Sequence, residues 1–353
     1  MHIEELTLNN FRCFSGIKIK LDPSINFFSG LNGAGKTSIL ESLFFLTHGR
    51  GFHYAKPRDL RKWNTDLVQI ATKVNHDNSN FWMGLGWDNE WSARLNGKSV
   101  KSISKLLLEL PLTVFNSDSV NLISGSSEYR RQFLDYILFH VKHDYKTYYS
   151  QYKKVLSQRN AALKMGLSVN PWNEQFCEFA DLIDNDRLQL CNRVSDILDK
   201  ELSLEHWVGS DLKLSYKPGW TKDSSLEQAL VDTEISDRKR GFTQVGPHRA
   251  DFSLYFRDHK AKQTVSRGEQ KWICAALMLS SALILQDLKH ITPVVLLDDP
   301  FSELDSDRAN ALLEASSSMG FQLLITGVEV PHCVLDKKAK VFHVEHENIT
   351  VID

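Results

Sequence analysis

The chain has 353 residues, of which 42% are hydrophobic and 24% charged, and its formal net charge is −2. This length predicts two domains or one domain with an insertion, and the composition is that of a globular protein. We find no apolar run long enough to cross a membrane, no signal peptide in the acidic start, and no metal-binding spacing among the five cysteines, which together favour the cytoplasm. The balanced charge does not indicate nucleic-acid binding, although a local basic patch would still permit it.

The chain begins with predicted strands. Residues 3–8 and 16–21 alternate between apolar and polar side chains, which predicts an antiparallel pair. Arg12 lies at the junction of the two strands and is either a solvated loop cation or a nucleotide contact. The short apolar run at residues 25–29 then predicts a buried strand.

A phosphate-binding loop follows this strand. Residues 30–37 fit the pattern G-x-x-x-x-G-K-[ST], and residues 38–46 predict the helix that should come next. A strand, a Gly-rich loop and a helix in this order aim backbone N–H groups and a helix N-terminus at an anion. We therefore predict that Lys36 reaches the β- and γ-phosphates of a nucleotide and that Thr37 holds Mg²⁺. The expected nucleotide-binding residues of this loop are Gly30, Leu31, Asn32, Gly33, Ala34, Gly35, Lys36, Thr37 and Ser38.

A β-rich layer is predicted next. Its strands cover residues 68–74, 81–87 and 91–95, with Asn96-Gly97 as a hairpin turn, and a basic turn around Arg50 precedes the layer. Its tryptophans are interpreted as core side chains rather than as base-stacking ones; they are Trp82, Trp87 and Trp91.

Two long helical patterns occupy the middle of the chain. Apolar residues recur at helical spacing over residues 128–164 and 176–197, and Asn170-Pro171 separates the two patterns. They predict an antiparallel αα-hairpin that forms a compact lobe rather than a long coiled-coil arm. The basic face of the first helix is either a DNA-binding surface or an ordinary solvated face. The candidate DNA contacts are Arg130, Arg131, Lys142, Lys146, Lys153 and Lys154.

A second anion-binding loop is predicted where an apolar helix opens, at residues 266–270 (Ser-Arg-Gly-Glu-Gln). The Ser266 hydroxyl, the bare backbone N–H of Gly268 and the positive helix end all favour an anion. This loop lies between the P-loop and a strand at residues 294–297 that is followed by two aspartates, which we call the Asp-Asp strand. This order of motifs is similar to that of ABC-type ATPases. That similarity implies that the loop acts on ATP held by a second subunit, in a head-to-tail homodimer with two ATP molecules at its interface.

The Asp-Asp strand covers residues 294–297 and is apolar throughout, as a buried parallel strand should be. Asp298 at its carboxyl end is expected beside the P-loop, where it supports Mg²⁺ together with Thr37. Asp299 is expected to orient the attacking water or to accept its proton.

Four further segments carry recognisable motifs besides the P-loop, the Ser-Gly loop and the Asp-Asp strand. They are Leu8-Asn9-Asn10-Phe11-Arg12, Glu128-Tyr129-Arg130-Arg131-Gln132-Phe133-Leu134-Asp135, Gln158-Arg159-Asn160-Ala161-Ala162-Leu163 and Gly246-Pro247-His248-Arg249-Ala250-Asp251. Taken together, the motifs resemble those of RecF, a family of bacterial DNA replication and repair proteins, over essentially the whole chain. R-R-x-F-L-D and G-P-H-R-x-D are specific to this family among ABC-type ATPases.

The resemblance implies an α/β fold, in which a P-loop ABC-type ATPase head with a mixed sheet and an antiparallel β layer carries an inserted compact α-helical lobe. Such a head is similar to those of SMC and Rad50 proteins. We expect residues 1–115 and 237–353 to form the head and residues 116–236 the lobe. Lys36, Asp298, Asp299 and Ser266 are then the catalytic residues, and Arg12, Gly268 and Asp305 of the D-loop join the nucleotide site.

The resemblance further implies ATP and Mg²⁺ as cofactors and a homodimer that forms on ATP binding. It implies binding to duplex DNA next to single-stranded gaps, help to RecO and RecR in loading RecA, weak DNA-stimulated ATP hydrolysis and no membrane. The processes implied are DNA repair, DNA replication and the SOS response.

Three departures from ABC-type ATPases predict slow hydrolysis. Glu269 stands where the Ser-Gly loop usually has Gln, and Thr326-Gly327 stands where transporters carry a switch histidine. A Q-loop should lie near residues 115–118 but has no clear equivalent there.

The ATP-dependent DNA-binding dimer described above can be called an ATP-gated DNA clamp. Three other functions are alternatives to it. A transporter ATPase subunit shares the short helical insert, but the chain shows no coupling features. A chromosome-organising head needs a long coiled-coil arm, for which the insert is too short. A fused nuclease needs a carboxylate cluster outside the P-loop set, and the sequence offers none.

Overall fold

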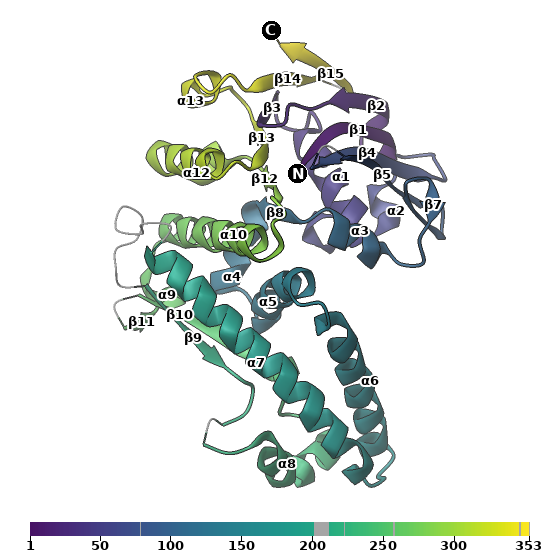
Figure 1. Ribbon diagram of the computed structural model, residues 1–353, viewed down its shortest axis with the longest axis vertical. Coiled ribbons are helices and arrows are strands. Elements are labelled where there is room, and N and C mark those ends of the chain that lie inside the picture. The colour runs from purple at the N-terminus through teal and green to yellow at the C-terminus, as the bar shows by residue number, and fades with distance from the viewer. Residues whose placement is uncertain (78, 201–211, 222, 257, 346, 353) are drawn as a thin grey trace. The chain divides into compact units, whose positions relative to one another are not determined.

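The chain folds into two compact units (Figure 1). Unit 1 combines Met1–Ser119 with Lys271–Asp353, and unit 2 is Val120–Gln270. The second boundary differs from the expected one at residue 237, because β10 (Asp251–Phe256) pairs with β9 (Leu212–Lys217) and so belongs to unit 2. The structure is a computed structural model that describes residues 1–77, 79–200, 212–221, 223–256, 258–345 and 347–352.

Unit 1 contains an antiparallel sheet with the strand order β2-β1-β4-β5-β6-β7. The predicted first pair is present, and its register places Leu8 opposite Ile17. Asn96-Gly97 forms the predicted turn between the last two strands. The strands are β1 (His2–Phe11), β2 (Phe14–Lys20), β4 (Val68–His76), β5 (Ser79–Trp87), β6 (Trp91–Leu95) and β7 (Lys98–Ser99).

The predicted core packing of the tryptophans is confirmed only in part. Trp87 packs against the hydrophobic core, and the centre of the Trp91 ring lies 5.8 Å from that of the buried Phe45 ring. Trp82 and Trp91 are 42% and 43% exposed, and Trp87 is only partly buried. In β5 the side chains of Met83 and Leu85 are buried, so the alternation of a strand places Trp82 on the opposite, solvent face.

The second sheet of unit 1 is mostly parallel and has the order β15-β14-β3-β13-β12-β8. β3 and β12 match the predicted buried strands, and every residue in both is buried. Because parallel strands end at the same edge of a sheet, the residues that follow β3, β8 and β12 meet there. The strands are β3 (Ile25–Ser29), β8 (Leu112–Phe115), β12 (Val294–Leu297), β13 (Gln322–Gly327), β14 (Lys340–Glu345) and β15 (Asn348–Ile352).

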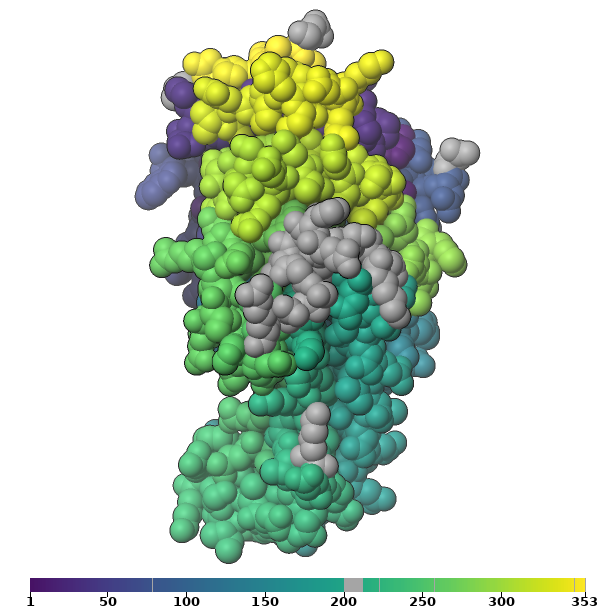
Figure 2. Space-filling model, turned by 90° about the vertical axis from the view of Figure 1, so that its left-hand side faces the viewer, coloured from purple at the N-terminus to yellow at the C-terminus, as the bar shows by residue number. Residues whose placement is uncertain are grey.

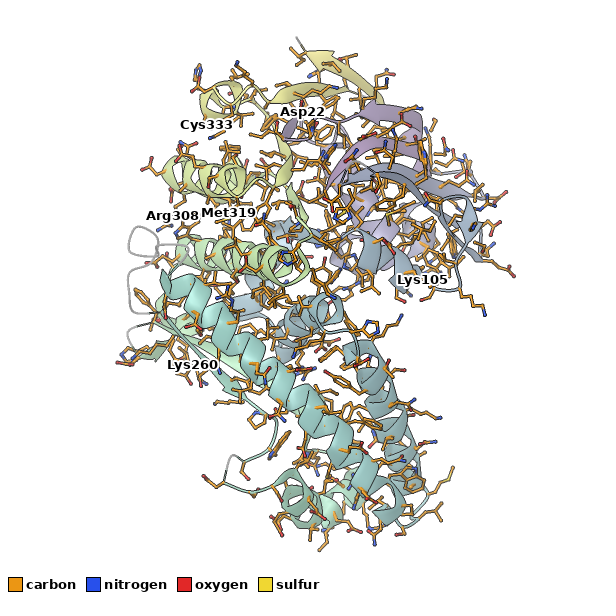
Figure 3. All side chains as sticks on the ribbon, in the orientation of Figure 1. Asp22, Lys105, Lys260, Arg308, Met319 and Cys333 are labelled. Atoms are coloured by element: carbon orange, nitrogen blue, oxygen red, sulfur yellow. The ribbon has the colours of Figure 1, made fainter. Side chains whose placement is uncertain are left out.

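The two sheets share one hydrophobic core in unit 1. Helix α1 (Lys36–His48) contacts β1 and β4 of one sheet and β13 of the other. Gln322 also links the sheets, because its amide accepts a hydrogen bond from the Ile3 N–H (2.7 Å) and donates to the carbonyls of Ile3 (2.8 Å) and Asp22 (2.7 Å). Asp22 is labelled in Figure 3.

The other helices of unit 1 surround the sheets. Figure 2 views the side on which α12 and α13 lie. Contrary to the expectation from the sequence, helix α10 is long and apolar enough to span a membrane by length and composition, but 72% of the apolar stretch is buried within the protein, as in a core helix. The helices are α2 (Pro57–Leu60), α3 (Ile103–Glu109), α10 (Arg267–Lys289), α11 (Pro300–Glu303), α12 (Ser306–Ser318) and α13 (His332–Leu335), with 3₁₀ turns at Phe52–Tyr54 and Ser117–Val120.

Unit 2 is mainly helical, with a small antiparallel sheet of order β11-β10-β9. Helices α6 and α7 form the predicted antiparallel hairpin (Figure 1). The predicted single helix over residues 128–164 is wrong, because Lys142 is extended and separates α5 from α6. Across this break the Tyr145 hydroxyl donates to the Asp135 carboxylate (2.5 Å). The elements are α4 (Asn121–Ser124), α5 (Ser127–Val141), α6 (Tyr145–Lys164), α7 (Asn170–Lys200), α8 (Leu226–Arg240), α9 (Ala261–Thr264), β11 (His259–Lys260) and a 3₁₀ turn at Pro247–Arg249.

Candidate nucleotide-binding site

The P-loop leaves β3 and enters α1 through glycines that no other residue could replace without strain. Gly30, Gly33 and Gly35 have φ angles of +149°, +82° and +106°. A Cβ on Gly30 would lie 2.3 Å from the Val344 carbonyl oxygen, so the loop also packs too closely against β14 for a side chain. Gly35 caps α1 without a side-chain hydrogen bond, which leaves the first N–H groups of the helix for an anion.

Lys36 lies inside the loop and binds only backbone oxygens. Its Nζ donates to the carbonyls of Gly30 (2.8 Å) and Leu31 (2.9 Å). Burial lowers the pKa of Lys36, and the nearby charges of Asp299 and Asp298 partly oppose this shift. The ammonium is therefore held by weak partners that a phosphate, with its full charge, could displace.

Asp298 lies beside the P-loop, as the sequence predicts. Its Oδ1 accepts hydrogen bonds from the hydroxyls of Thr37 and Thr326, both at 2.8 Å. Burial raises the pKa of Asp298, and the two hydroxyl bonds oppose that shift because they favour the charged carboxylate. The strand holds the carboxylate in place through the Asp298 N–H, which donates to the Phe115 carbonyl (2.8 Å).

Asp299 follows in a left-handed conformation, with φ +52°. Its N–H donates to the Thr326 hydroxyl (2.8 Å), and its carboxylate accepts a hydrogen bond from Ser302 (2.9 Å). Thr326 thus contacts both aspartates from the end of the neighbouring strand. The sequence shows Thr326 only as the replacement for a switch histidine, and no spacing signal indicates that it contacts both aspartates.

The residue set at this edge of the sheet fits Mg²⁺ and a nucleotide. Thr37 and Asp298 offer a hydroxyl and a carboxylate oxygen 2.8 Å apart, which are the hard oxygen ligands that Mg²⁺ prefers. The backbone N–H groups at the start of α1 and the Lys36 ammonium fit the phosphates. Asn116 comes directly after β8 at the same edge, in the segment where a Q-loop was expected.

Arg12 is not a solvated loop cation, because its side chain is bound within the protein. Its guanidinium forms a bidentate ion pair with the buried Glu41 of α1 (2.7 and 2.8 Å) and donates to the Asp59 carbonyl (3.2 Å). Glu41 in turn accepts a hydrogen bond from the Phe52 N–H (3.0 Å). Arg12 therefore ties the nucleotide-binding helix to the segment that follows it, a long-range pairing that sequence spacing does not reveal.

The Ser-Gly loop belongs to unit 2 and opens α10 with a capping box. The Glu269 carboxylate accepts from the Ser266 N–H (2.7 Å), and the Ser266 hydroxyl accepts from the Glu269 N–H (3.3 Å). The negative charge of Glu269 is thus used at the positive end of the helix. The spacing S-x-x-E is the signal that could have predicted this role.

The D-loop aspartate has a similar local role in unit 1. Asp305 caps α12 by accepting from the Arg308 N–H (3.0 Å), and its carboxylate lies 3.3 Å from the Arg308 guanidinium (Figure 3).

The two candidate DNA-binding arginines of α5 are bound within unit 2 instead. Arg130 makes a bidentate ion pair with Asp251 (2.6 and 3.2 Å) and also contacts two backbone carbonyls. Arg131 donates to the Ser127 hydroxyl and the Ala250 carbonyl. Both arginines are partly exposed, and their contact with DNA stays a prediction. The other candidates are exposed, although Lys142 pairs with Asp186 (3.1 Å) and Lys153 lies 5.0 Å from the Tyr149 ring centre; they are Lys142, Lys146, Lys153 and Lys154.

Two motif residues of unit 2, Asp135 and Arg159, form buried ion pairs with residues outside the motifs. Arg187 makes a bidentate ion pair with Asp135 (2.9 and 3.0 Å) and donates to the Pro247 carbonyl (2.7 Å). Arg159 and Asp237, both completely buried, pair at 3.1 Å. These contacts join the R-R-x-F-L-D and G-P-H-R-x-D motifs to the helices around them.

The fold and site define the class. A P-loop, an Asp-Asp strand beside it, an antiparallel β layer and a helical second unit are the architecture of an SMC-like ABC-type ATPase head. The family described as "RecF/RecN/SMC N terminal domain" matches residues 2–350. The structure is also similar to an Smc head bound to the C-winged helix domain of ScpA, with a TM-score of 0.57 at 16% identity over 100% of this chain and 97% of that one.

Curated relatives narrow the class to a family. The chain is 32% identical to the DNA replication and repair protein RecF of Saccharophagus degradans and 31% identical to that of Coxiella burnetii (strain CbuG_Q212), each over 99% of both chains. The structure of a RecF–ATP complex matches with a TM-score of 0.88 at 24% identity, over 100% of this chain and 98% of that one. The chain belongs to the RecF family of DNA replication and repair proteins.

Proposed function

We propose that the protein is an ATP-gated DNA clamp of recombinational repair. Two copies join on ATP binding, hold duplex DNA next to a single-stranded gap, and assist RecO and RecR in loading RecA in the cytoplasm. The observation that carries this proposal is the Thr37–Asp298 pair beside an open P-loop, in a chain of the RecF family. One solved relative is described as a recombination mediator in the RecFOR pathway, which supports the choice of partners.

In this proposal each residue of the site has one role. The P-loop N–H groups and Lys36 bind the phosphates, with the Lys36 ammonium leaving the Gly30 and Leu31 carbonyls. Thr37 and Asp298 hold Mg²⁺. Asp299 orients the attacking water and takes its proton on the carboxylate that now accepts from Ser302. Bound Mg-ATP supplies the phosphate charge that joins the subunits and the bond that is hydrolysed.

The second subunit completes the site in this proposal. Ser266 and Gly268 of one copy meet the γ-phosphate held by the other copy, so neither copy hydrolyses ATP efficiently alone. An aspartate at position 299 and a threonine at 326, in place of the glutamate and histidine of fast ABC enzymes, support slow turnover. In this proposal the ATP-bound dimer holds the DNA, and ATP hydrolysis lets the dimer release it.

ATP turnover and DNA binding together test this proposal. We expect slow ATP hydrolysis that rises on addition of DNA, and gel shifts that favour a gapped duplex over an intact one. Turnover at transporter-like rates, or turnover that ignores DNA, would contradict the clamp.

A further inference from the structure

A strongly basic segment follows the nucleotide-binding helix. We call residues 50–63 the basic connector; it carries five cationic side chains and one carboxylate, in a chain whose net charge is −2. The cations are Arg50, Lys56, Arg58, Arg61 and Lys62, and the carboxylate is Asp59. Such a local excess of positive charge is the electrostatic signature of a phosphate-binding surface.

The basic connector also displays aromatic side chains to solvent. Trp63 is 90% exposed, about twice the exposure of Trp82 (42%) on the neighbouring sheet. Tyr54 is 45% exposed, and the Arg50 guanidinium lies 4.1 Å from the centre of its ring. Leaving so large an apolar ring in water is unfavourable, so a nearly bare tryptophan among cations points to a ligand with a flat, apolar face and a negative charge.

The backbone beneath these side chains is firmly held. Glu41 of α1 accepts from the Phe52 N–H, and Arg12 bridges Glu41 to the Asp59 carbonyl. The Arg12 N–H also donates to the Leu60 carbonyl (2.7 Å). The basic connector is therefore attached to the same helix that begins at Lys36, and its side chains stand on a fixed base.

The cations of the basic connector differ in whether their side chains already bind partners within the protein. Lys62 pairs with Glu347 (2.6 Å), and Arg61 donates to the Asp66 carbonyl (2.9 Å), so both hold the fold. Lys56 and Arg58 are exposed at the start of α2, and Arg58 meets Asp59 only at 3.5 Å. These two are the side chains best placed to meet a phosphate from solvent.

We propose that the basic connector is a DNA-contact site that recognises the junction between duplex and single strand. Lys56 and Arg58 contact backbone phosphates, and Trp63 stacks on an unpaired base, which a continuous duplex does not offer. The proposal rests on the DNA binding proposed above and assigns it to unit 1 instead of the α5–α6 face. Arg12 and Glu41 connect the basic connector to α1. The start of this helix would then bind ATP, while Glu41 near its middle holds the DNA-contact site.

Trp63 variants test the stacking step. We expect Trp63→Ala to weaken binding to a gapped duplex about tenfold while changing binding to an intact duplex less than twofold, and Trp63→Phe to retain most of the affinity. Trp82→Ala is the matched control, since it removes another exposed tryptophan of unit 1. Fluorescence anisotropy with labelled gapped and intact duplexes at one salt concentration measures all four proteins.

Charge reversal tests the phosphate step. Lys56→Glu with Arg58→Glu should weaken binding to both DNAs and lower the slope of log affinity against log salt by about 1 to 2. Lys98→Glu with Lys338→Glu changes the net charge equally at other exposed sites and should leave the slope near that of the wild type. Circular dichroism checks that each variant is folded.

The outcomes separate this proposal from the one on which it rests. If the wild type prefers gapped DNA and the basic connector variants bind like their controls, the segment is not the contact site, and this proposal fails while the clamp stands. If the wild type binds neither DNA with or without ATP, the clamp itself fails, and this proposal fails with it. Selective loss in the Trp63→Ala protein on gapped DNA supports both.

Discussion

The charged residues at the P-loop edge of unit 1 and those in the buried ion pairs of unit 2 have different kinds of partner. In unit 1, Lys36 donates to two neutral carbonyls, and Asp298 accepts from two hydroxyls. In unit 2, Arg187 and Arg159 are buried against carboxylates that neutralise them. We therefore expect the charges at the P-loop edge to act in ligand binding and those of the buried ion pairs to act in stability.

Removal of a buried carboxylate from unit 2 should give the largest effect on stability. Asp135→Ala leaves the Arg187 charge buried and unpaired, and we expect the free energy of unfolding to fall by about 3–5 kcal/mol. Urea denaturation measures this loss. The double variant Asp135→Leu with Arg187→Met should recover much of it, and a double variant as unstable as the single one would contradict a role for the charge pair.

Removal of the charge from the P-loop should act on binding instead. We expect Lys36→Ala to weaken ATP binding about 100-fold or more, because a charge-assisted contact to phosphate is lost, while stability changes by less than about 1 kcal/mol. Isothermal titration with ATP and a parallel urea melt measure the two quantities. A destabilised protein with normal ATP affinity would place Lys36 in the structural group.

His248 gives unit 2 a pH dependence of stability. Burial lowers its pKa to about 4, while its ring nitrogens meet the Tyr152 hydroxyl (2.7 Å) and the Thr243 carbonyl (2.9 Å). The unfolded chain takes up this proton near pH 6.5, so stability is full above that pH and falls by up to about 3 kcal/mol as the pH drops to 4. His248→Gln should flatten this fall in melts at pH 7 and 5, whereas the exposed His143→Gln should not.

Substitution of Thr326 should have the smallest effect of these changes. It should shift the pH dependence of Mg-dependent ATPase activity. Its hydroxyl lowers the pKa of Asp298, so Thr326→Val should raise that pKa further. Since only the charged carboxylate holds Mg²⁺, the loss of Mg-dependent ATPase activity on acidification should begin at a higher pH in the variant. Thr326→Ser should keep the wild-type profile, and identical profiles for Thr326→Val and wild type would remove Thr326 from the site.

Local features of the molecule were readable from the sequence, and pairings between distant segments were not. β3, the P-loop and β12 were predicted because buried strands and Gly-rich loops carry their own signals. The end of α5 was missed because the helical pattern runs on through Lys142, while the break depends on tertiary contacts. Residues 237–270 fell in the wrong unit because the pairing of β10 with β9 joins segments far apart. The capping role of Glu269 was local and could have been read from S-x-x-E.

The solution molar mass in the presence of Mg-ATP tests the central claim most directly. Light scattering should give a monomer without nucleotide and a dimer with Mg-ATP for the wild type, with a gapped duplex strengthening the dimer. Lys36→Ala should stay monomeric because it does not bind ATP, and Ser266→Arg should bind ATP yet stay monomeric. A wild-type mass that does not respond to ATP, or a Ser266→Arg protein that dimerises normally, would contradict the claim that Ser266 completes the site of a second copy.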